Sequence, residues 1–404
     1  MSEFKLNFQD TATAFADKTN NQLREKYWLF KTMGSQALVN FGTSLTNFAL
    51  SFHLPVKTLI KKTLFRQFCG GETIAECEPT IVSLGKSHIG TILDYSVEGK
   101  SEEEDFCRTK NEIIETIKRA KDDENIPFAV FKVTGIAPLG TLEKMSSGAE
   151  LTDKGKWKWQ RIEARVDAIC QLAHSLEQSV FIDAEDSWIQ DAIDALAGSM
   201  MEKYNREKPI VFNTIQLYRH DRLEFLKSAH RKAKENGYLL AVKLVRGAYM
   251  EKERARAEEL NYPSPIQPDK AATDRDYDAA IDFCLENIED IAFVAGTHNE
   301  KSVQMLAQKM EEKCIPHNHP HVFFSQLYGM SDNLSYILAD NQYNVSKYVP
   351  YGPVEDAVPY LIRRAKENTS VMGQMSRELI LIDKELQRRK IRERQYGLRT
   401  DSNQ

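Results

Sequence analysis

The stretch Leu239-Leu-Ala-Val-Lys-Leu-Val-Arg-Gly-Ala-Tyr249 places two cations inside an apolar run. Such a run is typical of a parallel strand that is covered on both faces. Lys243 and Arg246 interrupt it, and a buried cation is costly unless it meets an anion or a ligand. Gly247 follows at once, and a glycine past a strand lets backbone approach a bound group closely. Both a salt-bridged core lysine with a turn glycine and a ligand site are consistent with this pattern.

Polar side chains recur at the ends of the other predicted strands. We expect eight strands, at residues 91–95, 128–133, 179–183, 210–215, 239–245, 291–295, 322–325 and 344–349. At or just past their ends lie Asp94, Lys132, Asp183, Gln216, Lys243, Thr297, Gln326 and Tyr348. In parallel α/β proteins ligands bind at the carboxyl ends of the strands. Eight polar residues in register therefore indicate a binding site.

Helical patterns separate these strands and define the fold class. They cover residues 102–121, 157–176, 189–203, 219–236, 276–285, 301–311 and 354–368. Eight βα units predict an α/β protein with a (β/α)8, TIM-like barrel at residues 89–372. The chain has no Gly-x-Gly-x-x-Gly after an early strand, which disfavours a dinucleotide-binding Rossmann domain.

The helix predicted at 354–368 carries a second chemical signal. Tyr360, Arg363, Arg364 and Glu367 have the spacing i, i+3, i+4 and i+7, so they share one face. An exposed Arg363–Glu367 pair would give this pattern at little benefit to stability. Adjacent arginines beside a tyrosine also form a clamp for a carboxylate, which guanidinium groups bind bidentately. If the helix crosses the barrel mouth, its arginines face the pocket.

Two extensions flank the barrel. The sequence predicts a helical arm at residues 1–88. The arm is amphipathic over residues 10–66, where apolar side chains recur at helical spacing: Leu23, Phe30, Leu38, Phe41, Leu45 and Leu50. A weaker helix is predicted at 76–87. We expect the arm to pack on the barrel or on a second subunit. Residues 373–404 predict a charged helix at 376–399 with a basic end, Arg388-Arg389-Lys390. A solvated tail and a contact with an anionic membrane or partner both fit that end.

Composition restricts the class of protein. The net charge of −5 argues against general nucleic-acid binding. No apolar stretch is long enough to span a bilayer, and the first residues resemble neither a secretory signal nor a transit peptide. The six cysteines are scattered, as in an intracellular protein, and we expect a cytoplasmic location with a peripheral contact at a membrane. Cys314-x-x-His317-x-His319-x-His321 matches no standard metal site, so no metal is expected.

Five blocks together resemble the signature of the proline dehydrogenase family. They are Ile182-Asp-Ala-Glu185, Lys243-Leu-Val-Arg-Gly-Ala-Tyr249, Gly296-Thr-His-Asn299, Gln326-Leu-Tyr-Gly-Met330 and Tyr360-Leu-Ile-Arg-Arg-Ala-Lys-Glu-Asn368. The resemblance runs in order from about residue 128 to 372. Residues 251–260 resemble the mitochondrial branch, and no aldehyde dehydrogenase module follows, so a monofunctional protein is expected.

The resemblance implies a flavoenzyme. Its expected features are non-covalent FAD, a distorted barrel with the last helix above the mouth, and oxidation of L-proline to Δ1-pyrroline-5-carboxylate. The hydride would pass from proline C5 to FAD N5, and the electrons to a membrane quinone. A cation near the N1–C2=O edge of the flavin, supplied by Lys243, Arg246 or a helix end, would stabilise the reduced ring.

The resemblance also implies roles for individual residues. Asp183, Lys243 and Tyr348 would be catalytic, with Asp183 on the amine side. Lys132, Arg363 and Arg364 would bind the proline carboxylate, and Leu327, Tyr348 and Tyr360 would pack on the ring. The cofactor would contact Ala184, Gln216, Lys243, Val245, Arg246, Gly247, Ala248, Tyr249, Thr273, Thr297, His298 and Asn299. Some relatives carry arginine where Lys243 stands, and lysine keeps the charge without the fork.

Three alternatives remain from the residues. The same chemistry could act on 4-hydroxyproline, although Tyr348 against the ring predicts a preference for proline. A metal-dependent or Schiff-base barrel lyase could use Lys132 or Lys243. A degenerate barrel could serve as a scaffold, but the intact set of Asp183, Tyr348, Arg363 and Arg364 argues against it.

Overall fold

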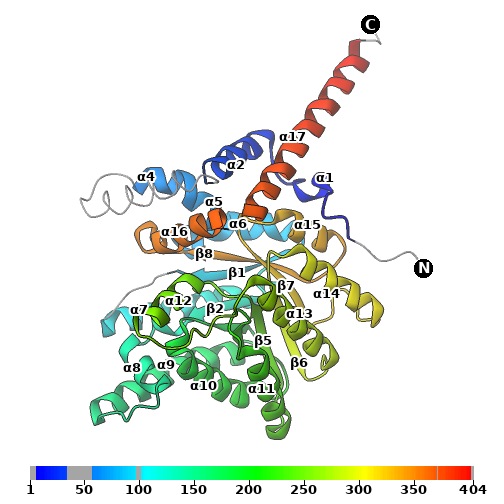
Figure 1. Cartoon of the computed structure of the whole chain (residues 1–404). Helices are drawn as coiled ribbons and strands as arrows, with labels where there is room; N and C mark the ends of the chain where they lie inside the picture. The colour runs from blue at the N-terminus through cyan, green and yellow to red at the C-terminus, as the bar shows by residue number, and fades with distance from the viewer. Residues whose placement is uncertain (1–5, 34–56, 97–101, 371, 402–404) are drawn as a thin grey trace.

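The computed structural model describes residues 6–33, 57–96, 102–370 and 372–401 (Figure 1). Eight parallel strands close into a barrel in sequence order, which confirms the predicted (β/α)8 class. The strands are β1 Ile89–Tyr95, β2 Phe128–Lys132, β3 Ser179–Asp183, β4 Val211–Gln216, β5 Leu240–Val245, β6 Ile291–Gly296, β7 Val322–Leu327 and β8 Val345–Tyr351. All eight overlap the predicted strands. Apolar runs buried on both faces place them in a sheet that helices enclose.

The helices that surround the barrel include three that the sequence pattern did not predict: α8 Leu139–Ser146, α12 Met250–Glu259 and α15 Asp332–Asp340. The predicted ones are α7 Glu103–Ala120, α9 Asp153–Ser175, α10 Ser187–Tyr204, α11 Arg222–Asn236, α13 Lys270–Glu286, α14 Glu300–Glu312 and α16 Val354–Ser370. Helix α12 is highly charged and α15 is buried nearly all round, so neither shows a one-sided apolar period.

Several predicted helix boundaries were wrong; α9, for example, begins at Asp153, four residues before the predicted 157. Helix α13 begins at Lys270, six residues before the predicted 276, because Asp269 accepts a hydrogen bond from the Ala272 N–H and caps the helix. The C-terminal helix α17 covers Met372–Asp401, longer than the predicted 376–399. It projects away from the barrel at its far end (Figure 1).

Aromatic rings fill the barrel interior. Phe128 stacks on Phe181 with 4.5 Å between ring centroids, and it meets Phe212 and Phe323 edge-on at 5.4 and 4.9 Å. Tyr348 belongs to the same apolar cluster. The interior is therefore a packed core, and polar chemistry is restricted to the end of the barrel.

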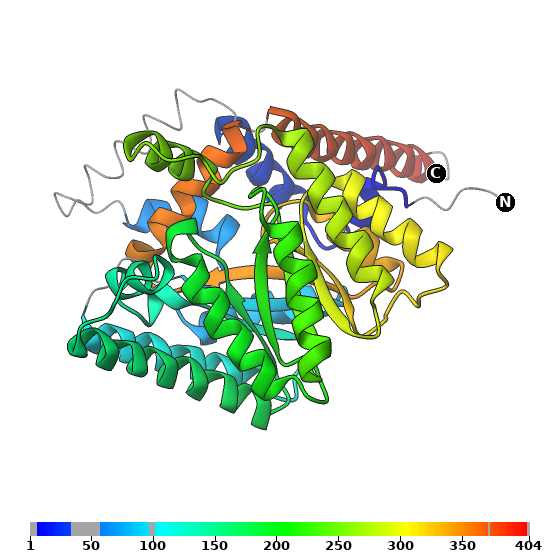
Figure 2. The ribbon, with the colours of Figure 1, turned by 60° about the horizontal axis from the view of Figure 1, so that its bottom comes forward.

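The arm packs against the last barrel helix. Its described elements are α1 Thr11–Ala14, α2 Asn20–Met33, α4 Lys57–Ile60, a π-helical turn at Lys61–Phe65, α5 Arg66–Phe68 and α6 Ile74–Gly85. Phe15, Leu23 and Phe30 share a second apolar core with Leu361 of α16 and Leu381 of α17. The predicted apolar positions Leu38, Phe41, Leu45 and Leu50 lie outside the described residues. The arm thus supports α16 from the side away from the barrel (Figures 1 and 2).

Within the described residues, no helix is both long and apolar enough to cross a membrane.

Candidate active site

Four polar side chains meet at the carboxyl ends of β2, β3, β5 and β8. The Tyr348 hydroxyl donates a 2.8 Å hydrogen bond to Oδ2 of Asp183, and Lys243 forms an ion pair with Oδ1. Lys132 Nζ lies 3.3 Å from the Tyr348 hydroxyl and 4.0 Å from Asp183 Oδ2. Lys132 and Asp183 are register partners in the sheet. The structure thus brings together the three predicted catalytic residues and one predicted carboxylate ligand.

The charges in this cluster determine its protonation. Burial alone would raise the pKa of Asp183, but Lys243 and Lys132 outweigh burial and lower the pKa. Burial and the negative charge of Asp183 raise the pKa of Tyr348 well above its ordinary value. At neutral pH the pair therefore consists of a carboxylate and a protonated phenol that donates to it.

Each lysine has its own carboxylate. Lys132 Nζ lies 3.1 Å from Oδ2 of the buried Asp94, which also accepts a 2.6 Å hydrogen bond from Ser96. Lys243 Nζ pairs with Asp183 and lies 5.0 Å from the ring centroids of both Phe181 and Tyr348. A buried ammonium between a carboxylate and two ring faces is stabilised by both. The structure therefore confirms the salt-bridged lysine that the sequence left open, and it lies within the site.

Helix α16 lies at the same end of the barrel, close to α12 (Figures 1 and 2). Tyr360 and Arg364 are buried, and the Arg364 guanidinium lies 5.3 Å from the Tyr360 ring centroid. Arg363 is partly exposed and lies 5.8 Å from the ring centroid of Tyr249, which directly follows the β5 loop. The predicted partner Glu367 has a side chain outside the described part. Arg363 thus contacts the residue that follows the β5 loop and Arg364 is buried, so neither arginine is simply solvated.

His298 follows β6 and is held as a neutral ring. Its Nδ1 lies 2.8 Å from the Ser331 hydroxyl, and its Nε2 accepts a 3.4 Å hydrogen bond from the Leu327 N–H. Burial, followed by the charges of Lys347 and Arg364, lowers the pKa of His298 to about 3. An imidazole that accepts at Nε2 carries its proton at Nδ1 and donates it to Ser331.

Arg246 lies among side chains of the barrel wall. Its guanidinium donates to Asp274 at 2.7 Å, to the Thr297 hydroxyl at 2.8 Å and to Ser302 at 3.0 Å, and it stacks on Tyr277. The sequence suggested Arg246 as an alternative to Lys243 for the cation near the flavin edge. In the structure its guanidinium is already bound by these side chains. Arg246 instead fixes the side chain of Thr297, a predicted cofactor residue.

Two more predicted cofactor residues shape helix starts. Asn299 is the N-cap of α14 and accepts hydrogen bonds from the N–H groups of Lys301 and Ser302. Thr273 lies in the first turn of α13, where its hydroxyl donates to the Asp269 carbonyl at 3.2 Å. The N-terminus of α14 presents partial positive charge at the barrel mouth.

Gly247 is required by a neighbouring ring. Its φ of +133° lies in the region that favours glycine, and an added Cβ would lie 2.5 Å from the ring of Tyr218. The backbone N–H of Tyr218 also donates to the Arg246 carbonyl at 2.7 Å. The sequence predicted that the backbone at Gly247 approaches a bound group; the structure shows a close approach to the ring of Tyr218. The predicted cofactor residues Val245 and Ala248 flank this turn.

Gln216 at the end of β4 is oriented by the loop after β3. Its Nε2 donates a 2.6 Å hydrogen bond to the Glu185 carbonyl, and the Glu185 N–H donates to Gln190 Oε1 at 2.8 Å. The Glu185 carboxylate accepts from the Thr134 N–H at 3.0 Å, which joins the β2 and β3 ends. The backbone around Ala184 is therefore fixed on both sides.

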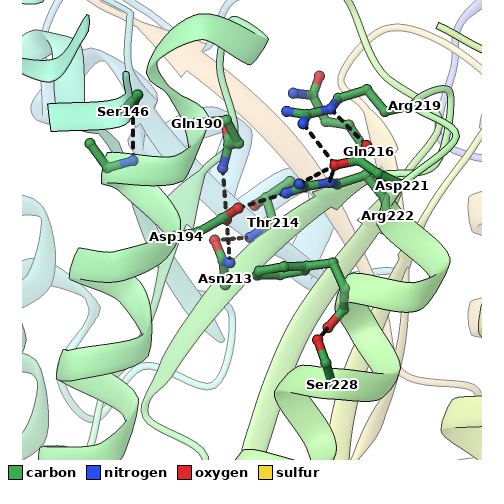
Figure 3. Close-up of polar contacts among 12 residues, drawn as sticks. Ser146, Gln190, Asp194, Asn213, Thr214, Gln216, Arg219, Asp221, Arg222 and Ser228 are labelled. Atoms are coloured by element: carbon green, nitrogen blue, oxygen red, sulfur yellow. Dashed lines mark hydrogen bonds and ion pairs between the residues drawn. The ribbon is translucent and has the colours of Figure 1, made fainter. Parts of the chain in front are cut away.

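A buried polar network behind Gln216, which sequence reasoning missed, continues this support (Figure 3). Asp194 of α10 accepts hydrogen bonds from Gln190 at 2.9 Å, Asn213 at 2.8 Å and Arg222 at 2.6 Å. These residues come from three elements and share no local motif. The one sequence signal for this network is that its polar residues interrupt apolar patterns.

The histidines before β7 have structural roles. His317 Nδ1 binds the Asn341 carbonyl at 2.7 Å while the ring stacks on Tyr343, and His321 Nδ1 binds the Ile288 carbonyl at 2.8 Å. Throughout the described ranges no three potential ligand residues are grouped as a metal site would need.

Fold and site together define a (β/α)8-barrel enzyme with a cation-rich mouth built from strand ends and one crossing helix. Residues 77–377 match the family model described as proline dehydrogenase. The chain belongs to this family of oxidoreductases, as the sequence blocks predicted.

Several relatives support this membership. The chain is 33% identical to "Proline dehydrogenase 1, mitochondrial" of Dictyostelium discoideum, over 94% of this chain and 74% of the relative. It is 31% identical to "Proline dehydrogenase 2, mitochondrial" of Arabidopsis thaliana, over 96% and 91%. It is also 33% identical to "Carbapenem antibiotics biosynthesis protein CarD" of Pectobacterium carotovorum, over 80% and 83%.

The fold is similar to that of a larger solved protein. Proline utilization A from Bdellovibrio bacteriovorus, inactivated by N-propargylglycine, superposes with a TM-score of 0.70 at 21% identity. The match covers 92% of this chain and 40% of that one. This chain therefore corresponds to less than half of that protein.

Proposed function

We propose that this protein oxidises L-proline to Δ1-pyrroline-5-carboxylate with bound FAD. The main support is the meeting of two groups at one end of the barrel. The Asp183–Tyr348 pair with Lys132 comes from the strand ends, and Arg363 and Arg364 come from α16. Together they suit a small molecule with an amine at one end and a carboxylate at the other.

The carboxylate is bound by the cations. Lys132 comes from the end of β2 and the two arginines come from α16, which follows β8, and guanidinium groups bind carboxylates bidentately. Leu327, Tyr348 and Tyr360 provide the apolar contact for the ring. This binding fixes the carbon that loses hydride, and positioning is a large part of such catalysis.

The donor set also fits FAD. Lys243 and the N-terminus of α14 supply positive charge for an anionic cofactor, and Gln216 supplies an uncharged amide group. Neutral His298, whose two ring nitrogens already bind Ser331 and Leu327, supplies an uncharged ring surface. Ala184, Val245, Gly247, Ala248, Tyr249, Thr273, Thr297 and Asn299 complete the proposed cofactor contacts, with Arg246 acting through Thr297. When bound, FAD accepts the hydride that leaves proline C5.

Asp183 has the clearest electrostatic role. As the C5–H bond breaks and a C5=N bond forms, positive charge develops on the substrate nitrogen, and the amine proton is also lost. An ionised carboxylate beside the nitrogen stabilises that charge. Tyr348 and Lys243 orient Asp183, because each binds a different carboxylate oxygen.

Tyr348 also sets ring specificity. Its buried hydroxyl is held by Asp183, so the ring cannot move away from a larger substrate. We expect proline to be preferred over 4-hydroxyproline, and equal turnover of the two would refute this role.

The lyase alternative is disfavoured. A Schiff-base lysine must lose its proton, but Lys132 and Lys243 are each paired with a carboxylate.

We propose that the electron acceptor is a quinone. The protein, in an intracellular location, would reach it through a peripheral contact with the membrane. Exposed Ile391 lies beside Lys390 and Arg392 near the end of α17, a combination of apolar and basic groups that suits an anionic surface. Flotation of the full chain with anionic vesicles tests this contact, and absence of binding at low salt would contradict it.

One spectrum tests the central proposal. The purified protein should show flavin absorbance that bleaches when proline is added without oxygen and returns with a quinone analogue. A colourless protein that takes up no added FAD, or a flavin that proline does not reduce, would contradict it.

A further inference from the structure

A buried cluster of four charges joins the arm and the C-terminal helix to the barrel. Lys26 Nζ of α2 lies 2.7 Å from Asp332 Oδ2 and 3.0 Å from Glu378 Oε1 of α17. Lys347 Nζ of β8 lies 3.0 Å from Asp332 Oδ1. All four residues are buried, and the two cations balance the two anions.

The cluster is electrostatically coupled. Burial alone would lower the pKa of Lys26, but Asp332 and Glu378 outweigh it and raise the pKa. Burial likewise opposes ionisation of Asp332, yet Lys26 and Lys347 hold its pKa far below the ordinary value. Removal of one partner would leave an uncompensated buried charge.

This cluster contacts the loop that holds His298. Lys347 Nζ donates to the carbonyls of Met330 at 2.5 Å and Leu327 at 3.5 Å, so it fixes both ends of the turn after β7. Asp332 directly follows Ser331, whose hydroxyl binds His298 Nδ1. Ser331 has a left-handed φ of +50°, a conformation that the surroundings must maintain.

We propose that Lys26 of the N-terminal arm is a positioning residue for the cofactor site. It orients Asp332, which with Lys347 sets the turn at residues 327–332 and through Ser331 the ring of His298. Lys26 and Glu378 both lie outside the family match at residues 77–377, so the catalytic unit includes segments beyond it. The inference rests on the proposed FAD site.

FAD affinity of the full-length holoenzyme tests the inference, measured by release of flavin fluorescence on dilution. Lys26→Met should raise the apparent Kd for FAD by about tenfold or more. Lys31→Met, an exposed residue of the same helix, is the matched control and should not change it. Lys26→Arg should restore most of the affinity because it keeps the charge.

A second variant separates positioning from simple charge burial. Lys26→Met combined with Glu378→Gln removes one charge of each sign and leaves the Asp332–Lys347 pair. If Lys26 positions Asp332, the double variant recovers thermal stability but still binds FAD weakly. Recovery of both, or an unchanged Kd in Lys26→Met, would overturn the inference. A wild-type chain that binds no FAD would overturn the proposed function itself.

Discussion

The Tyr348 hydroxyl and the Asp183 carboxylate, from opposite sides of the barrel closure, are 2.8 Å apart and buried. A hydrogen bond to a charged acceptor contributes about 1.5–3 kcal/mol. Tyr348→Phe removes it while keeping the ring. We expect kcat/KM for proline to fall about 10–100-fold, since 1.4 kcal/mol corresponds to tenfold. Steady-state kinetics measure this effect, and turnover of 4-hydroxyproline should decline less. An unchanged kcat/KM would separate the hydroxyl from catalysis.

Asp183 also compensates the buried charge of Lys243. Asp183→Asn leaves that ammonium without its carboxylate, and breaking a buried pair in this way costs about 3–5 kcal/mol. We expect a large loss of stability in urea unfolding. Lys243→Met added to Asp183→Asn should restore much of the stability but no activity. If the double variant is as unstable as the single one, charge compensation is not the cause.

His298 predicts a dependence of stability on pH. Its pKa is about 3 in the folded protein and about 6.5 in an unfolded chain, so only the unfolded state binds a proton between these values. The free energy of unfolding is therefore not reduced by this histidine above pH 6.5, and it decreases as the pH falls from 6.5 towards 3. His298→Gln should therefore weaken the loss of melting temperature between pH 7 and 5.

Exposed His220 provides the control for this experiment. His220→Gln should keep the wild-type difference between the two pH values. If His298→Gln also keeps the full difference, other groups cause the acid sensitivity.

Glu253 connects the two loops proposed to contact the cofactor. Its fully buried carboxylate accepts from the Ser187 N–H at 2.6 Å and from the Ser187 hydroxyl at 2.5 Å, at the N-terminus of α10. It thereby joins the start of α12, after Tyr249, to the loop that contains Ala184. Glu253→Ala should destabilise the fold by about 1–3 kcal/mol and weaken FAD binding.

Glu251 lies on the same helix and is exposed. Glu251→Ala should change neither melting temperature nor FAD affinity. Should Glu253→Ala lower stability without altering FAD affinity, the link would be structural alone.

The strands could be predicted from sequence because buried parallel strands are continuous apolar runs. The polar residue at each strand end could then be placed, since a closed parallel barrel brings those ends together. Helix α12 could not be predicted, because its pattern Met250-Glu-Lys-Glu-Arg-Ala-Arg is nearly all charged. Its Glu253 is recognisable only once Ser187 is seen beside it.

Contacts between residues that are distant in sequence also could not be predicted. Lys26 and Asp332 are 306 residues apart, and nothing local identifies Lys26 as buried rather than as one more lysine on a polar helix face. For Arg246 the need for a partner could be predicted, but the partners themselves could not. The sequence identified it as a cation that needs a partner, but the partners Asp274, Thr297 and Ser302 emerged only from the fold.

Arg363 gives the most direct test of substrate binding. It is only partly buried and contacts Tyr249 at the mouth, so its replacement should not disturb the barrel. Arg363→Met removes one guanidinium from the proposed carboxylate clamp. We expect KM for proline to rise about tenfold or more while FAD content and melting temperature stay close to wild type. Arg363→Lys keeps the charge but loses the bidentate geometry, so its KM for proline should lie between those of the wild type and Arg363→Met. If KM is unchanged in Arg363→Met, the carboxylate is bound by Arg364 and Lys132, and Arg363 only closes the mouth against Tyr249.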